Sequence, residues 1–160
     1  MSPLTLHPLF RDEPRRRLVG IGRDETAVLR LREQYATARA HGDRLAELFY
    51  DRLFRLHPQL RPMFRTDPSV QQSKLMDSLD AVMAYLDRPD EQALLLVEMG
   101  RRHAAYGAAP AHYRIVAELL SDAVTELLGD KADAQTRQDW LDAFNLVSDH
   151  MLAGAETLER

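Results

Sequence analysis

Residues 99–113 read MGRRHAAYGAAPAHY, a stretch in which one predicted helix ends and the next begins. Apolar residues recur at helical spacing ahead of His103, which predicts an amphipathic helix. Gly107 is typical of a helix C-terminus, and Pro110 is typical of the first turn of a new helix. His103 is therefore predicted to lie near the end of a helix.

A histidine in this position has two interpretations, and the stretch alone leaves both open. One is a solvated or capping side chain, because a positive charge is favoured at the C-terminal end of a helix. The other is a neutral imidazole that reaches into an apolar pocket and binds iron, with its second ring nitrogen held by a neighbouring group.

The same helical periodicity extends to both sides of this stretch. Asp24 is expected to cap the first helix. The predicted breaks between helices are, in chain order, Gly42-Asp43, residues 58–64, Thr66–Ser69, Asp87–Asp90, Gly107 and Gly129. Because the helices differ in length and show no heptad run, the sequence favours an all-α fold in which about seven helices pack irregularly around a pocket.

The first 23 residues differ in character from the rest of the chain. They contain three prolines and two glycines and show no sustained periodicity, so we expect a partly ordered N-terminal extension. Residues 24–160 are expected to form one domain. The chain's total of 160 residues, 45% of them hydrophobic and 29% charged, suits a single soluble globular domain.

The composition argues against several classes of function. The formal net charge is −4 with both signs interspersed, and the Arg15–Arg17 run is interpreted as a solvated turn, so no nucleic-acid surface is expected. The absence of cysteine excludes disulfides, thiolate catalysis and cysteine-ligated metals. No histidine pair has metal-ligand spacing, and no phosphate-binding loop is present. No apolar run approaches the ~20 residues that cross a bilayer, and the N-terminus lacks the apolar stretch of a signal peptide, so we expect a cytoplasmic protein.

Several other residues are separated from His103, or from one another, by definite numbers of residues along the sequence. Leu75 precedes His103 by 28 residues, and Phe64 follows Tyr50 by fourteen. The residues that fall in this register are Tyr50 within the motif FYDRLF, Phe64, Gln71, Leu75, Tyr113, Trp140 and Phe144. With these positions, the segment from Leu48 to Met151 resembles the globin domain of flavohaemoglobins and of single-domain bacterial haemoglobins.

This resemblance implies a haem b cofactor whose iron is held by His103 on one side, the proximal side. Tyr50 and Gln71 become the distal pair, which would donate hydrogen bonds to a bound gas that carries partial negative charge. Gln72 is the alternative to Gln71, because a shortened loop leaves the register there uncertain by one residue.

The resemblance also implies contacts with the rest of the cofactor. Phe64, Leu75 and Leu79 would pack on it as apolar neighbours, an interpretation that overlaps with an ordinary core role. Lys74 and Arg102 are candidates for its propionates, although long cationic side chains on helices are usually just solvated. The remaining implied neighbours are Met99 and Tyr113, the latter close to His103.

The pattern departs from the family at one position near the C-terminus. Flavohaemoglobins place a glutamate beside the proximal tyrosine, and counting from Trp140 puts that position at Thr157, with Glu156 adjacent. An offset of one residue turns a helical side chain by about 100°. We therefore expect less electron donation to the iron, which favours reversible binding over redox chemistry.

The resemblance leaves three functions open. The first is reversible binding of oxygen, nitric oxide or carbon monoxide at a pentacoordinate haem iron, by a monomer or weak homodimer. The second is a nitric oxide dioxygenase, which would need a separate reductase to supply electrons. The third is a gas-sensing globin. Whether the chain is an enzyme therefore stays undecided at the level of the sequence.

Overall fold

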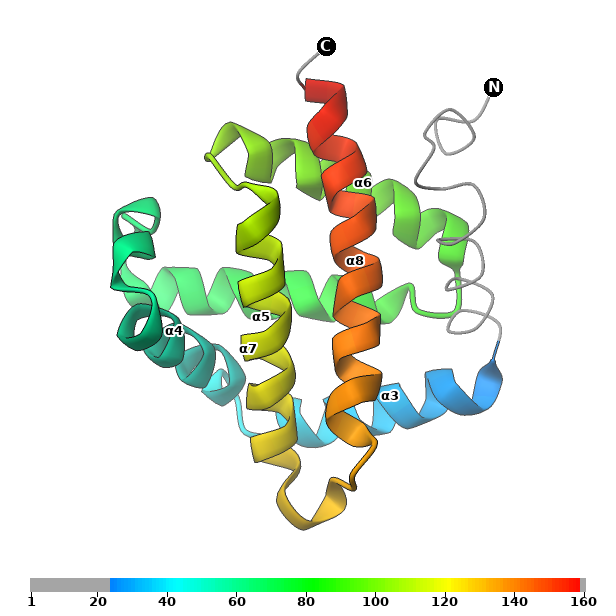
Figure 1. The fold of residues 1–160 in the computed structure, drawn as a ribbon. Coiled ribbons are helices and arrows are strands. Elements are labelled where there is room, and N and C mark those ends of the chain that lie inside the picture. The colour runs from blue at the N-terminus through cyan, green and yellow to red at the C-terminus, as the bar shows by residue number, and fades with distance from the viewer. Residues whose placement is uncertain (1–23, 159–160) are drawn as a thin grey trace.

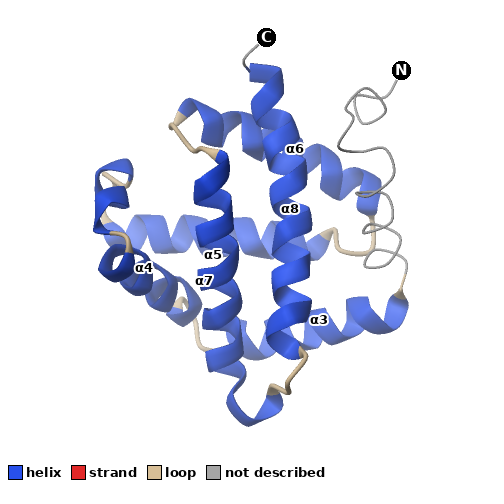
Figure 2. Ribbon diagram, viewed as in Figure 1, coloured by secondary structure: helices blue, strands red, loops and turns tan. Residues whose placement is uncertain are grey.

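The computed structural model describes residues 24–158, so the predicted extension and the Arg15–Arg17 run lie outside the described residues. Within 24–158 the chain forms helices and no strand (Figure 2). In chain order the helices are α3 (Glu25–Arg39), α4 (Arg44–Leu56), η2 (Pro58–Met63), α5 (Pro68–Ala84), α6 (Pro89–Ala105), α7 (Pro110–Leu128), η3 (Gly129–Lys131) and α8 (Thr136–Leu158). The all-α class is confirmed.

Local capping chemistry sets several of the helix ends. The Asp24 side chain accepts hydrogen bonds from the N–H groups of Thr26 and Ala27 at 3.0 and 3.2 Å, so it caps α3 as predicted. Gly107 follows α6 with a φ of 95°, a left-handed conformation that suits glycine and stops a helix. Pro110 then opens α7, where its missing N–H costs nothing.

Three predicted connections contain more helix than expected. Residues 58–63 form the 3-10 helix η2 rather than an irregular link. Pro68 and Pro89 each open a helix, so the turns predicted at 66–69 and 87–90 include the first turns of α5 and α6. The reason is that proline fits the first turn of a helix as well as a loop, which makes its sequence signal ambiguous.

The helices cross in two layers. α7 and α8 stand side by side at the front of Figure 1, and α3, α5 and α6 cross behind them. α8 packs on α6 and α7, whereas α4 packs on α7 and α5. α6 thus makes most of its contacts with α8, and α5 and α6 contact each other only sparsely.

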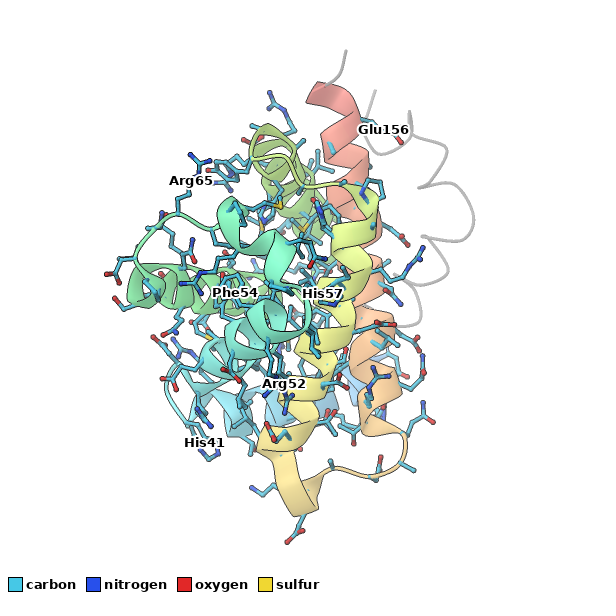
Figure 3. All side chains as sticks on the ribbon, turned by 60° about the vertical axis from the view of Figure 1, so that its left-hand side comes forward. His41, Arg52, Phe54, His57, Arg65 and Glu156 are labelled. Atoms are coloured by element: carbon cyan, nitrogen blue, oxygen red, sulfur yellow. The ribbon has the colours of Figure 1, made fainter. Side chains whose placement is uncertain are left out.

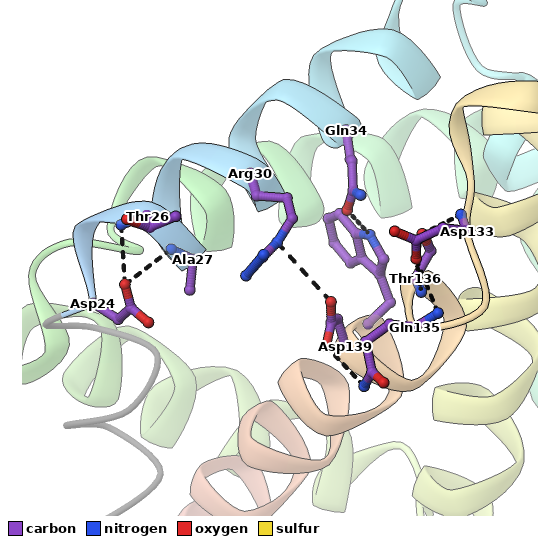
Figure 4. Close-up of polar contacts among 10 residues, drawn as sticks. Asp24, Thr26, Ala27, Arg30, Gln34, Asp133, Gln135, Thr136 and Asp139 are labelled. Carbon is purple, nitrogen blue, oxygen red and sulfur yellow. Dashed lines mark hydrogen bonds and ion pairs between the residues drawn. The ribbon is translucent and has the colours of Figure 1, made fainter.

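Polar contacts fix α3 against its neighbours. Tyr35 donates to Asp80 of α5 at 2.5 Å, and Arg39 binds both oxygens of the same carboxylate at 3.1 and 3.2 Å. On α8, the indole N–H of Trp140, which is 2% exposed, donates to Gln34 at 2.8 Å (Figure 4). Since an unmade hydrogen bond is costly when buried, these contacts hold α3 in place against α5 and α8.

α6 and α8 touch at their backbones. An added Cβ atom on Gly100 would overlap the carbonyl oxygen of Met151, and one on Gly154 would overlap the carbonyl oxygen of Val97. Two glycines, one on each helix, thus allow this close approach. The contact lies one turn before His103, so it fixes the helix that carries this residue.

Candidate functional site

The ring of His103 is oriented by its own helix. Its Nδ1 atom lies 2.7 Å from the carbonyl oxygen of Met99, one turn earlier in α6. Because a carbonyl oxygen only accepts hydrogen bonds, Nδ1 carries the proton in this contact. In the neutral ring Nε2 is then unprotonated and has a lone pair for a metal. Nε2 makes no hydrogen bond within residues 24–158.

Two tyrosines flank this histidine. The rings of Tyr106 and Tyr113 lie 6.3 and 6.5 Å from the His103 ring, measured between centroids. Tyr113 is 9% exposed, and its buried hydroxyl has no hydrogen-bond partner among the described residues. Burial raises the pKa of Tyr113, so the phenol is neutral. The structure thus places Tyr113 beside His103, in ring contact rather than through a hydrogen bond.

A cluster of aromatic rings lies at the end of α4 and beyond η2. Tyr50, Phe54 and Phe64 form a triangle with centroid distances of 5.8, 5.6 and 5.5 Å, and Phe49 packs on Tyr50 from another side at 5.0 Å. Such edge and offset contacts hold rings in place. Burial raises the pKa of Tyr50 to about 12, so its hydroxyl remains a hydrogen-bond donor at neutral pH.

The distal candidates on α5 lie between core and surface. Gln71 and Gln72 are both half-buried, so burial does not separate them. Leu75 is half-buried against the core, and Leu79 is buried within it. Met76, next to Leu75, is completely buried in the main core.

The remaining cofactor candidates lie on α5 and α6, and they differ in how far their side chains are exposed. Met99 packs on the second hydrophobic cluster, with Val82, Leu96, Tyr113 and Met151. Lys74 and Arg102 are exposed and have no carboxylate partner within the described residues.

These residues suit a cofactor that brings its own metal and needs a single protein ligand. No group of three or more His, Asp or Glu side chains within 24–158 could hold a metal ion by itself. Instead, the structure provides one oriented imidazole on α6, a neutral phenol among aromatic rings on α4, and aliphatic side chains on α5. This donor set fits haem.

Two histidines have roles that the sequence did not indicate. His112 is half-buried, and its Nδ1 accepts a hydrogen bond from the N–H of Ala109 at 2.9 Å, which caps α7. His150 is completely buried in α8, and burial lowers its pKa to about 4. His150 lies three and four residues after the apolar residues Val147 and Leu146, a spacing that could have indicated its burial from the sequence.

Comparison with known proteins identifies the family. The sequence model of the Globin family matches residues 47–151. The chain belongs to the globin family. This confirms the predicted family and the globin fold. No helix within the described residues is long and apolar enough to span a membrane.

The similar curated proteins are flavohemoproteins. The chain is 32% identical over 120 residues to one from Rhizobium meliloti, a match that covers 73% of this chain and 30% of that protein. A flavohemoprotein from Bacillus subtilis is 30% identical over 112 residues, covering 68% of this chain and 28% of that protein. The chain thus spans less than a third of the length of these relatives.

The chain is also similar to a solved structure, the closed form of the HGbRL globin domain. It shares 26% sequence identity, with a TM-score of 0.41, and the match covers 85% of this chain and 99% of that one.

Proposed function

We propose that this protein binds haem b through Nε2 of His103 and reversibly binds a diatomic gas, such as oxygen, on the opposite face. The hydrogen bond from Nδ1 of His103 to the Met99 carbonyl carries the proposal, because it selects the tautomer that a metal requires and fixes the ring plane. The haem supplies the iron that holds the gas. The protein's own residues position it, surround it and donate hydrogen bonds.

The absence of cysteine bears on the type of haem. Covalent attachment of a c-type haem uses a C-x-x-C-H motif, and the chain contains no cysteine. The cofactor is therefore held by the His103 ligand, apolar contacts from Phe64, Leu75, Leu79 and Met99, and cations at its edge. Lys74 and Arg102 are exposed, which suits groups that meet propionates at the surface.

The residues on the proximal side, around His103, favour reversible gas binding over redox catalysis. In the related flavohaemoglobin pattern a glutamate reinforces the proximal tyrosine, but here the side chain of Glu156 is exposed. The Tyr113 hydroxyl makes no hydrogen bond within residues 24–158. No described side chain therefore strengthens electron donation through this tyrosine. Nitric oxide dioxygenase activity is the second candidate, because the relatives are flavohemoproteins, and it requires an electron donor.

An absorption spectrum of the purified full chain, titrated with haemin, tests the proposed function. We expect an intense Soret band that saturates at one haem per chain, and a ferrous form that shifts reversibly when carbon monoxide is added and removed. A titration that shows only the spectrum of free haemin would falsify the proposal. A six-coordinate ferrous spectrum without added gas would contradict an open distal position.

Replacing Tyr50 with phenylalanine is expected to speed oxygen dissociation about tenfold, because one buried hydrogen bond of ~1.4 kcal/mol corresponds to a factor of ten. The aromatic triangle with Phe54 and Phe64 survives this change, since only the hydroxyl is removed. Stopped-flow displacement of oxygen by carbon monoxide measures the rate. Tyr85→Phe at the end of α5 removes the same atom away from the site and serves as the control. Equal rates in both variants would remove Tyr50 from the distal role.

A further inference from the structure

α5 and α6, the helices that carry the proposed distal and proximal residues, contact each other only sparsely. His103 on α6 is held through the close packing of α6 on α8. α5 takes no part in that packing. The distance between the two sides of the site is therefore set by the contacts that hold α5 to the rest of the fold.

The start of α5 has few anchors. None of residues 68–74 is buried, and no side chain among them forms a hydrogen bond or ion pair with another helix of the described region. The hydrogen bonds from Ser69 to the Asp67 side chain, at 2.6 and 2.9 Å, are local to the helix end. Gln71 and Gln72, the candidate distal amides, lie in this part of α5. Their position therefore depends on how the rest of the helix is held.

The two ends of α5 lie in different surroundings. In Figure 1, α5 begins at the left, next to η2, and ends at the right, above α3. Figure 3 turns the left-hand side forward, and Arg65, in the link that leads into α5, lies at the outer edge of the molecule, further out than Phe54 of the aromatic cluster. The start of α5 thus lies at the periphery, whereas its second half lies against α3.

The second half of α5 is bonded to its neighbours. Asp80 accepts hydrogen bonds from Tyr35 at 2.5 Å and from Nε and Nη2 of Arg39 at 3.1 and 3.2 Å, and both partners belong to α3. The Val82 carbonyl oxygen accepts a hydrogen bond from the Gln92 amide of α6 at 3.0 Å. Asp80 is the one side chain of α5 that bonds to another helix within the described region.

The contacts around Asp80 form a connected network. Arg39 meets the carboxylate through two nitrogens, a geometry that holds the pair in one orientation. Its guanidinium also donates to the Gly42 carbonyl at 3.0 Å and to Asp43 at 3.3 Å. Tyr35 is 8% exposed, and burial together with the hydrogen bond to Asp80 raises its pKa, so the phenol stays protonated and donates. A network of this kind fixes a helix more firmly than an isolated surface ion pair does.

The position of this network along α5 connects it to the site. Asp80 follows Leu79, a proposed haem contact, and lies nine residues after Gln71. Nine helical residues span ~13 Å, so a tilt of about 5° at Asp80 would move the start of α5 by roughly 1 Å. A hydrogen bond weakens steeply when its geometry departs by that much. We propose that Asp80 is a positioning residue of the gas site, which through Tyr35 and Arg39 holds α5 where its distal amide reaches the bound gas. This rests on the proposed haem binding.

Asp80→Ala in the haem-loaded full chain tests this role. We expect oxygen to dissociate about threefold faster, because the distal hydrogen bond is misplaced rather than removed. The infrared band of bound carbon monoxide, which responds to hydrogen-bond donors beside the gas, should shift or split. Tyr35→Phe, which removes a donor at the other end of the network, should change both in the same direction. Asp77→Ala is the matched control: it removes an exposed carboxylate one turn earlier on α5 that has no ion pair in the described region, and it should change the rate by less than about 1.5-fold.

A second comparison separates positioning from a general loosening of the fold. In a chain that carries both Gln71→Leu and Gln72→Leu, adding Asp80→Ala should change the rate by less than about 1.5-fold, because residues that act through one another are not additive. Equal acceleration with and without the two amides overturns the proposal, as does an Asp77→Ala protein that matches Asp80→Ala. If Asp80→Ala does not fold, Asp80→Asn, which still accepts from Tyr35 but carries no charge, takes its place in both comparisons and should shift the rate in the same direction.

Haem uptake and amide hydrogen exchange distinguish this proposal from the proposed function. If the unsubstituted chain takes up no haem, the proposed function fails, and hydrogen exchange of the haem-free chain still decides whether Asp80 fixes α5. We expect the amides of residues 71–79 to exchange at least about tenfold faster in Asp80→Ala but not in Asp77→Ala, while α7 is unchanged. Unchanged exchange along α5 contradicts the positioning role even where haem binds normally.

Discussion

His103→Ala is expected to abolish stable haem retention. The imidazole is the proposed iron ligand, held by its contact with the Met99 carbonyl, and alanine would leave the iron without that bond to the protein. The helix itself should persist, because alanine is the strongest helix former and the lost hydrogen bond to Met99 is within α6. We therefore expect a helical circular dichroism spectrum like that of the unsubstituted chain, together with loss of the Soret band after gel filtration.

Free imidazole distinguishes loss of a ligand from loss of the pocket. If the pocket survives, added imidazole should restore part of the haem spectrum by occupying the place of the side chain. His57→Ala, which removes a half-buried histidine at the end of α4, is the control and should retain haem fully. A His103→Ala protein that keeps its haem with an unchanged ferrous spectrum would show that another residue binds the iron.

The helix ends that depend on local chemistry could be predicted from the sequence. Asp24, Gly107 and Pro110 act within a few residues of themselves, so the helix ends that they set could be predicted. Proline was the exception at Pro68 and Pro89, because the residue suits both a turn and a first helical turn.

The site residues came from spacing and resemblance rather than from composition. Their register indicated that His103, Tyr50 and Phe64 belong together, but spacing carries no information on ring orientation. The triangle of Tyr50, Phe54 and Phe64 depends on how η2 returns against α4, which is a tertiary arrangement. The unmade hydrogen bond of Tyr113 likewise depends on which side chains surround its hydroxyl, and these come from distant parts of the chain.

Gly100 shows most clearly where prediction from sequence ends. In the sequence it is one residue of the Gly-Arg-Arg-His stretch, in the interior of a predicted helix where glycine is unfavourable by about 1 kcal/mol relative to alanine. Helix propensity alone therefore predicts that alanine would stabilise the protein. The structure reverses that expectation, because the position faces the backbone of Met151 from α8, fifty-one residues away.

Gly100→Ala is accordingly expected to destabilise the protein by about 2 kcal/mol or more, since overpacking usually costs 1–3 kcal/mol and the obstacle here is a backbone carbonyl that cannot rotate away. For a domain of this size the melting temperature should fall by roughly 5–10 °C. Gly154→Ala, which meets the carbonyl oxygen of Val97, should behave alike. Ala36→Gly at an exposed position of α3 measures the propensity effect without a contact between helices. Thermal unfolding with and without haem makes the comparison.

The loss of melting temperature can be compared between the haem-loaded and the haem-free protein. The difference shows whether the contact between α6 and α8 also positions His103 or only packs the two helices. To accept a Cβ atom the two helices must separate, and His103 lies less than one turn from the point of separation. The imidazole would then shift relative to α5, so haem should bind more weakly and contribute less to stability by mass action. If Gly100→Ala lowers the melting temperature of the haem-free and haem-loaded protein equally, the contact serves packing alone. A larger loss in the haem-loaded protein shows that the glycine pair positions the ligand, and an unchanged melting temperature contradicts the close approach itself.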